Sequence, residues 1–222
     1  MSHPESSIMP VGFYQRHALL VARDLLGCAL TRRLPDGTLL SGTIVETEAY
    51  MPNDPSCHAH RGESAKARSM FQAGGIAYVY LIYGMYFCLN VVTGGAGEGA
   101  AVLIRAVEPT AGLAEMIAAR GTAGIRDLAR GPGRLCQAMR IDRGLDGSCI
   151  TGGDCPLLIE RGPALPDSAV AQTPRIGINV TPLAVEAPWR LIVRDNRFVS
   201  GTRRQNQPAD YAPALDWFNQ DV

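Results

Sequence analysis

The sequence is almost without lysine. Lys66 is its only lysine, and the other 20 of its 21 basic residues are arginines. Chemistry that uses a lysine amine as nucleophile therefore has one candidate side chain, apart from the N-terminal amine.

The sequence also lacks any CxxC pair and any signal-peptide pattern. Its first ten residues, MSHPESSIMP, contain no basic segment followed by an apolar run. Six cysteines without either feature predict reduced thiols rather than a disulfide framework. We therefore expect a cytoplasmic protein.

No segment is apolar for long enough to predict a membrane-spanning helix. The longest uncharged stretch, Ser69–Gly97, contains four tyrosines, several glycines and an asparagine. An apolar fraction of 46% excludes a disordered chain, and 222 residues are enough for one domain, at most two.

Charge is balanced overall and uneven locally. Formal net charge is zero, but residues 190–204 hold five arginines against Asp195, and residues 126–143 hold five against Asp127 and Asp142. The last eighteen residues hold three aspartates and no basic residue. Basic surface patches suited to a nucleic acid are compatible with this distribution, and so are scattered solvated arginines.

The hydrophobic pattern and the turn residues predict more strands than helices. Because the strands follow one another directly, they favour an α+β domain around an antiparallel sheet, with no linker that separates two domains. Helices are expected over 14–26, 110–120 and 132–139, with a short one near 64–71. Strands are expected over 28–34, 38–50, 76–83, 86–92, 101–107, 157–160, 175–178 and 189–194.

Two glutamates lie close together in the segment IVETEAY, residues 44–50. Strand alternation places Ile44, Glu46, Glu48 and Tyr50 on one face, and Val45, Thr47 and Ala49 on the other, expected core face. A half-exposed strand with two solvated glutamates is one interpretation. A general base beside an aromatic ring is the other.

A histidine-containing loop follows. His58 and His60 flank Ala59 next to Cys57, but no second pair of ligands stands at a familiar zinc spacing, so a metal site is disfavoured. A single histidine that donates a hydrogen bond or stacks on a ligand fits the segment better.

The segment YVYLIYGMYFCLN predicts a hairpin that turns at Tyr83–Gly84–Met85. An exposed Tyr and Met at its tip imply a partner surface, and such side chains can act as a wedge that unstacks DNA bases. A core hairpin whose tyrosines only pack is the alternative.

Arg105 is a charged residue in an apolar strand, so it needs a partner such as Glu48 or a phosphate. Gly131-Pro132-Gly133-Arg134 precedes an expected helix and could form a weak phosphate cradle of backbone amides.

These segments occur in the order and spacing of one family. IVETEAY, the histidine loop, YVYLIYGMYFCLN, AAVLIRAVEP and GPGRLCQA together resemble the alkyladenine (3-methyladenine) DNA glycosylases of the class that includes the human enzyme. The resemblance covers about residues 10–200 and leaves 201–222, an acidic C-terminal tail, outside. It implies one mixed domain, residues 1–222, around a curved antiparallel sheet with a protruding hairpin.

The activity that this resemblance implies is base excision repair by a monofunctional glycosylase. Such an enzyme flips an alkylated or deaminated purine out of double-stranded DNA, hydrolyses its N-glycosidic bond with an activated water, and leaves an abasic site. The resemblance implies no cofactor, metal or membrane partner. It also implies that the protein is associated with the nucleoid in a bacterium or is nuclear in a eukaryote. A monomer is the default.

The resemblance also implies a role for individual residues. Glu48 would activate the water and Arg105 would help to position it. Tyr83, with Met85 beside it, would fill the gap in the base stack, and Asn90 would exclude guanine by crowding its amino group. The pocket around the flipped base would be lined by Tyr50, His58, Tyr80, Asn90 and Leu103.

Two other functions compete with this one. A non-catalytic module that binds damaged DNA would keep the wedge and the pocket. A hydrolase of free nucleosides would use Glu46 and Glu48 as a carboxylate pair and would not need Tyr83.

Overall fold

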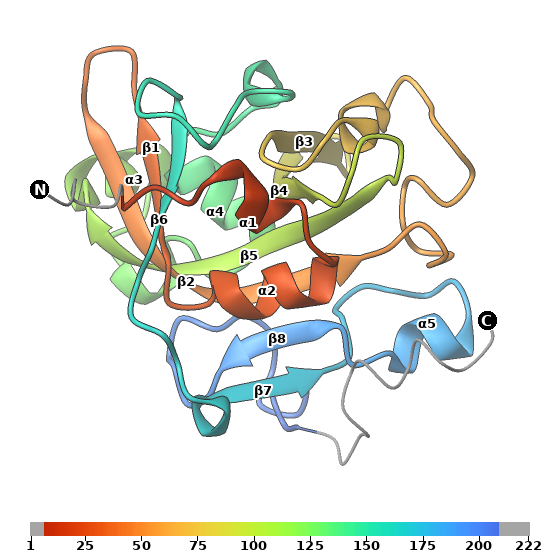
Figure 1. Cartoon of the computed structure of the whole chain (residues 1–222). Coiled ribbons are helices and arrows are strands. Elements are labelled where there is room, and N and C mark those ends of the chain that lie inside the picture. Colours follow the sequence, from red (N-terminus) through yellow and green to blue (C-terminus); the bar gives the residue numbers. More distant parts are fainter. Residues whose placement is uncertain (1–6, 209–222) are drawn as a thin grey trace, which may run out of the picture.

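The computed structural model describes residues 7–208 and confirms an α+β fold built on an antiparallel sheet (Figure 1). The strands are β1 (Ala29–Arg33), β2 (Leu39–Tyr50), β3 (Ala77–Ile82), β4 (Tyr86–Thr93), β5 (Ala100–Ala111), β6 (Leu157–Glu160), β7 (Val170–Thr173) and β8 (Arg190–Val193). The α-helices are α1 (Val11–Tyr14), α2 (Ala18–Leu25), α3 (Leu113–Arg120), α4 (Pro132–Ala138) and α5 (Pro182–Glu186). The acidic C-terminal tail was predicted over residues 201–222, and its part from residue 209 on lies outside the described residues.

The sheet divides at β2, which with β5 is one of its two longest strands. Its main path runs β3-β4-β5-β2-β1-β6, and every pairing is antiparallel. One half of β2, Leu39–Thr43, pairs with β1, whereas Glu46–Glu48 in the other half pair with β8, which in turn pairs with β7. Figure 1 shows this β7–β8 pair set apart from the rest of the sheet, beyond α2. The two glutamates therefore lie where the sheet branches.

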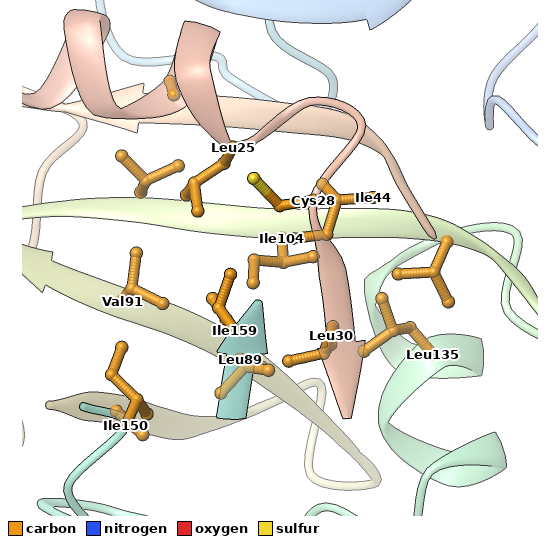
Figure 2. Packing of buried hydrophobic residues seen from close by; sticks show 14 of the residues in the cluster. Leu25, Cys28, Leu30, Ile44, Leu89, Val91, Ile104, Leu135, Ile150 and Ile159 are labelled. Atoms are coloured by element: carbon orange, nitrogen blue, oxygen red, sulfur yellow. The ribbon is translucent and has the colours of Figure 1, made fainter. Parts of the chain in front are cut away.

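The main core connects the sheet to helices α2 and α4. Leu25 of α2 and Leu135 of α4 pack in one cluster with Ile44, Leu89 and Ile104 from three neighbouring strands (Figure 2). A smaller cluster, built around Tyr78 and Met70, lies under the histidine loop. Burial of this scale is the main source of the free energy that stabilises the fold.

Several expected elements are confirmed with shifted ends. The helix predicted over 14–26 is α2 alone, because the chain turns after α1 and His17 caps the new helix by accepting a hydrogen bond from the amide of Leu19. The helix predicted over 110–120 begins at Leu113, since β5 extends to Ala111. The 3₁₀ turn η1 (Arg68–Phe71) is the short helix expected near 64–71.

The strand predicted over 175–178 is wrong. The strand in this region is β7, which ends at Thr173. Pro174 has no backbone N–H to donate to a sheet, and Gly177 has a φ of 84°, so residues 174–178 form an irregular segment with a turn at Ile176–Gly177. This turn becomes a wall of the site described below.

The expectation of reduced thiols is wrong for one pair. Cys149 and Cys155 form a disulfide, with Cα atoms 5.7 Å apart. The other four cysteines are free and buried. A six-residue separation outside any familiar motif did not indicate this bond.

Candidate active site

One row of side chains crosses the sheet from strand to strand. Tyr78 on β3 is paired with Asn90 on β4, Asn90 with Leu103 on β5, Leu103 with Glu48 on β2, and Glu48 with Arg190 on β8. Paired residues on neighbouring strands project to the same face. Residues that alternate with this row, such as Val79, Leu89 and Ile104, lie in the main core. The sheet thus separates an apolar face from a polar one.

Two shifts of register in opposite directions determine the face of the sheet to which the charged side chains point. Between Ile44 and Glu46 the extra residue is Val45 on β2, and between Glu46 and Thr47 it is Arg105 on β5. Such bulges change the face to which the following side chains point. The predicted grouping of Ile44 with the glutamates is therefore wrong: Ile44 packs in the main core, together with Ala49.

A cavity of about 260 Å³ opens on the polar face. The structure brings together the residues predicted for it, because its lining includes Tyr50, His58, Tyr80, Asn90, Leu103 and Arg105. Tyr83 also contributes to the lining, whereas Met85 does not. His60, the alternative histidine, is exposed.

Glu48 lies directly behind this lining. Its side chain is fully buried. Oε2 accepts a hydrogen bond from the hydroxyl of Tyr50 (2.9 Å) and lies 3.2 Å from Nη1 of Arg105. Oε1 accepts one from the backbone amide of Ile176 (2.8 Å). The carboxylate is fixed in place, and Oε1 keeps a lone pair for another donor.

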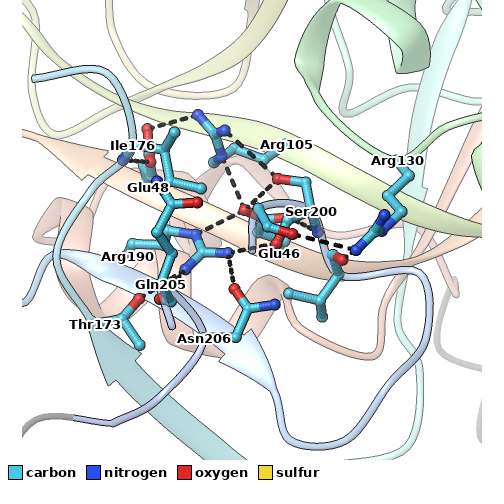
Figure 3. A network of polar contacts seen from close by, with 12 residues as sticks. Glu46, Glu48, Arg105, Arg130, Thr173, Ile176, Arg190, Ser200, Gln205 and Asn206 are labelled. Atoms are coloured by element: carbon cyan, nitrogen blue, oxygen red, sulfur yellow. Dashed lines mark hydrogen bonds and ion pairs between the residues drawn. The ribbon is translucent and has the colours of Figure 1, made fainter. Parts of the chain in front are cut away.

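Glu46 is equally buried and binds two arginines (Figure 3). Its Oε1 accepts from Nε of Arg105 (2.9 Å), Nε of Arg190 (2.7 Å) and the hydroxyl of Ser200 (2.8 Å). Its Oε2 accepts from the amide of Ser200 (2.7 Å). The interpretation of both glutamates as solvated is therefore wrong, and the predicted pairing of Arg105 with Glu48 is confirmed.

The charges in this network stabilise one another. Burial alone raises the pKa of Glu46, but the guanidinium groups of Arg105 and Arg190 and the amide of Ser200 outweigh it, and the pKa of Glu46 falls below its usual value. Burial likewise opposes the charge of Arg105, yet Glu48 and Glu46 raise its pKa overall. Both groups remain ionised.

His58 is a neutral aromatic wall of the cavity. Burial, assisted by the charge of Lys66, lowers the pKa of His58 to about 4. The ammonium of Lys66, 3.4 Å from Nε2, can only donate, so Nδ1 carries the proton and donates to the hydroxyl of Tyr78 (2.8 Å). The rings of His58 and Tyr80 meet edge to face, with centroids 4.5 Å apart. The lone lysine therefore lies at this wall.

Two loops that line the cavity are joined by a buried ion pair that the sequence did not reveal. Arg175 is bound through two nitrogens to the carboxylate of Asp54. Its guanidinium lies over the rings of Tyr50 (4.7 Å) and Trp189 (4.8 Å). No sequence motif indicated this pair, since Asp54 and Arg175 are 121 residues apart and Arg175 was assigned to a strand.

The hairpin tip projects into solvent, as predicted. Tyr83 is 79% exposed and Met85 64% exposed. Tyr83 has a φ of 54° and Gly84 one of 70°, and positive φ is uncommon for an aromatic residue. The tip therefore exposes two large apolar side chains without cover from the described part of the chain, and one of them, Tyr83, borders the cavity.

The two basic segments of the sequence meet beside the cavity. Arg126 donates to the carbonyl of Arg197 (3.1 Å), and Arg130 donates to those of Val199 (2.8 Å) and Gly201 (3.2 Å). We call the resulting surface the arginine patch; it comprises Arg120, Arg126, Arg130, Arg134, Arg194, Arg197 and Arg203. It is continuous with the cavity through Pro132, which borders both. The predicted phosphate cradle at Gly131–Arg134 borders it too, and its role stays a prediction.

Within residues 7–208, no group of three or more His, Cys, Asp or Glu side chains could hold a metal ion. The same residues include no helix with the length and apolar character needed to cross a bilayer.

Comparison with known proteins gives a consistent result. Residues 12–197 match the family model described as methylpurine-DNA glycosylase (MPG). A protein of Herpetosiphon aurantiacus is 57% identical over 98% of this chain and 99% of its own length, and one of Carboxydothermus hydrogenoformans is 45% identical over 87% and 98%. A third, from Methanoculleus marisnigri, is 44% identical over 86% and 98%. Each bears the name "Putative 3-methyladenine DNA glycosylase".

The Asp54–Arg175 pair predicts a large effect on stability. Replacing Asp54 by Asn leaves the buried guanidinium without a counter-ion, and we expect the free energy of unfolding to fall by about 3–5 kcal/mol. Urea denaturation measures this. Asp24→Asn is the control: Asp24 is exposed and its partner Arg16 is only half-buried, so a loss below about 1 kcal/mol is expected. Equal losses in the two variants would contradict the interpretation.

Proposed function

The chain belongs to the methylpurine-DNA glycosylase family and is a DNA glycosylase of repair; from this we propose that it flips an alkylated or deaminated purine out of duplex DNA and hydrolyses its N-glycosidic bond with an activated water. The product is an abasic site. The observation that carries the proposal is the ion pair of Glu48 and Arg105 behind a cavity walled by aromatic rings.

In this proposal Glu48 is the general base. Departure of the base leaves positive charge on the sugar, which a nearby carboxylate stabilises while it deprotonates the attacking water. The free lone pair on Oε1 of Glu48 supports this role, because the other contacts of the carboxylate hold it still. Arg105 lines the cavity and lies 3.2 Å from Oε2 of Glu48, which supports a role in positioning the water.

The cavity walls suit a flat, electron-poor ring. Tyr50, Tyr80 and neutral His58 offer aromatic faces and edges to a purine. An N-alkylated purine is often cationic, and tyrosine faces attract a cation more than a neutral base. Asn90 is buried, and its side-chain amide donates to the carbonyl of Tyr78 (3.1 Å), so it is a rigid group that could crowd the amino group of guanine.

The hairpin tip would take the place of the flipped nucleotide. A base leaves the stack only if the cost of unstacking is offset, and an inserted apolar side chain offsets part of it. The exposure of Tyr83 and its place at the cavity rim support this role, with Met85 beside it.

The arginine patch would bind the phosphates of one arm of the duplex. Its seven arginines face Asp127 and Asp195, so its local charge is strongly positive although the whole chain is neutral. Neutralised phosphates release counter-ions, which makes the affinity for DNA fall as salt rises.

Base release from a duplex with one hypoxanthine, detected as strand cleavage after alkali, tests the activity. We expect the wild type to cleave and Glu48→Gln to be slower by about 10²-fold or more, because the general base is lost. Glu115→Gln, an exposed glutamate on α3, should match the wild type. A methylated purine is the second substrate if hypoxanthine is inert.

Wild-type rates in Glu48→Gln would contradict the assignment of the base. Tight binding of damaged DNA without release of either base would instead favour the non-catalytic binding module.

Tyr83→Ala tests the wedge. We expect base release from duplex DNA at limiting enzyme to fall by about 5- to 100-fold, as for the loss of one aromatic–base stack, with release from a single strand little changed. Leu39→Ala, another exposed apolar residue, should leave both rates unchanged. Turnover of free nucleosides that does not depend on Tyr83 would favour the nucleoside hydrolase.

The salt dependence of binding tests the arginine patch. In the double variant Arg197→Gln/Arg203→Gln, the slope of log affinity against log salt should shrink by about 0.9 for each phosphate that the variant no longer neutralises, on damaged and undamaged duplexes alike. Arg33→Gln/Arg161→Gln removes the same charge away from the patch and should keep the wild-type slope. Equal slopes in all three proteins would exclude the arginine patch as a phosphate-binding surface.

A further inference from the structure

We propose that Glu46 is a positioning residue for base release, which acts by holding Arg105 so that one of its nitrogens faces Glu48. This inference rests on the proposed function. It concerns the second glutamate of the segment, which the mechanism above leaves without a task.

The two glutamates contact different nitrogens of one guanidinium, that of Arg105. Nε of Arg105 binds Oε1 of Glu46 at 2.9 Å, and Nη1 lies 3.2 Å from Oε2 of Glu48. A guanidinium is planar, so fixing Nε on one side fixes the direction of Nη1 on the other. Without Glu46, the Arg105 side chain could turn toward the open cavity that it lines.

Glu46 can hold Arg105 because it is itself immobile. Four hydrogen bonds reach its two oxygens, and they come from Arg105, Arg190 and Ser200. Arg190 in turn uses every N–H of its guanidinium, with Thr173, Ser200, Gln205 and Asn206 as its other acceptors (Figure 3). The support therefore passes from Asn206 through Arg190 to Glu46, and then to Arg105.

The negative charge of Glu46 contributes to this role as well as its hydrogen bonds. Glu46, Glu48, Arg105 and Arg190 sum to zero, and all four are buried. If Glu46 loses its charge, two guanidinium groups are left with one carboxylate. Arg105 is then drawn onto Glu48 alone, and its guanidinium leaves the position that it holds between the two carboxylates.

A purely structural role for Glu46 makes a different prediction. It would lower the stability of the protein and the fraction of folded enzyme, but not the rate of base release by folded, DNA-bound enzyme. Single-turnover rates with enzyme in saturating excess separate these cases, together with the dissociation constant for the damaged duplex.

The decisive experiment is a double-mutant cycle with Glu46→Gln and Arg105→Gln. We expect Glu46→Gln to lower the single-turnover rate by about 10- to 100-fold, as for a misplaced catalytic group, while affinity for the duplex stays within about twofold. In the Arg105→Gln background, Glu46→Gln should lower the rate no further, because its effect passes through Arg105.

Ser200→Ala covers the case in which Glu46→Gln does not fold. It removes the hydroxyl that binds Oε1 of Glu46 and Nη2 of Arg105 and leaves every charge in place. We expect a smaller fall, about two- to fivefold, that also disappears in the Arg105→Gln background. Thr31→Ala is the matched control, since it removes another buried hydroxyl, which bonds Ser41 on the part of the sheet away from the cavity, and its effect should combine additively with Arg105→Gln.

Each outcome decides the matter. If the effects of Glu46→Gln and Arg105→Gln on the logarithm of the rate are additive, the positioning role is wrong and the proposed function stands. The same conclusion follows if Glu46→Gln is less stable but releases base at the wild-type rate. A wild type that releases no base overturns both.

Discussion

Two carboxylates and two guanidinium groups, withdrawn from water, are the interaction on which the rest of the site depends. Buried ions are costly unless each finds partners, and here Glu46, Glu48, Arg105 and Arg190 are partners of one another. They come from β2, β5 and β8, so these three strands must meet at one place. The branch of the sheet and the paired bulges at Val45 and Arg105 are the geometry that allows it.

Local patterns in the sequence predicted much of the fold and most of the cavity. Alternation along the strands correctly placed Glu48 and Tyr50 on one face, and the need of a buried arginine for a partner correctly linked Arg105 to Glu48. The exposed Tyr83 followed from the hairpin signal. Membership of the family, expected from five motifs, is confirmed by the match over residues 12–197. The roles of the site residues stay predictions.

The parts that were missed depend on contacts between distant residues. A bulge at Val45 is set by pairing with β5 and has no sequence signature, so Ile44 was placed on the wrong face. Two partners of Glu46 are far from it in the sequence: Arg190 is 144 residues away and Ser200 is 154 residues away. The periodicity of a sequence reflects contacts within about one turn of a helix or a few residues of a strand at a time, so it does not predict interactions at this separation.

The long separation between Glu46 and its partners also affects the order of events during synthesis. Domains generally form as a chain emerges from its N-terminus, and here two residues that complete the charge cluster, Ser200 and Asn206, follow all eight described strands along the chain. The sheet and its apolar core can assemble earlier, but the carboxylates have no full set of partners until then. During synthesis the sheet can therefore form while Glu46 and Arg190 still lack some of the partners that neutralise and hold them.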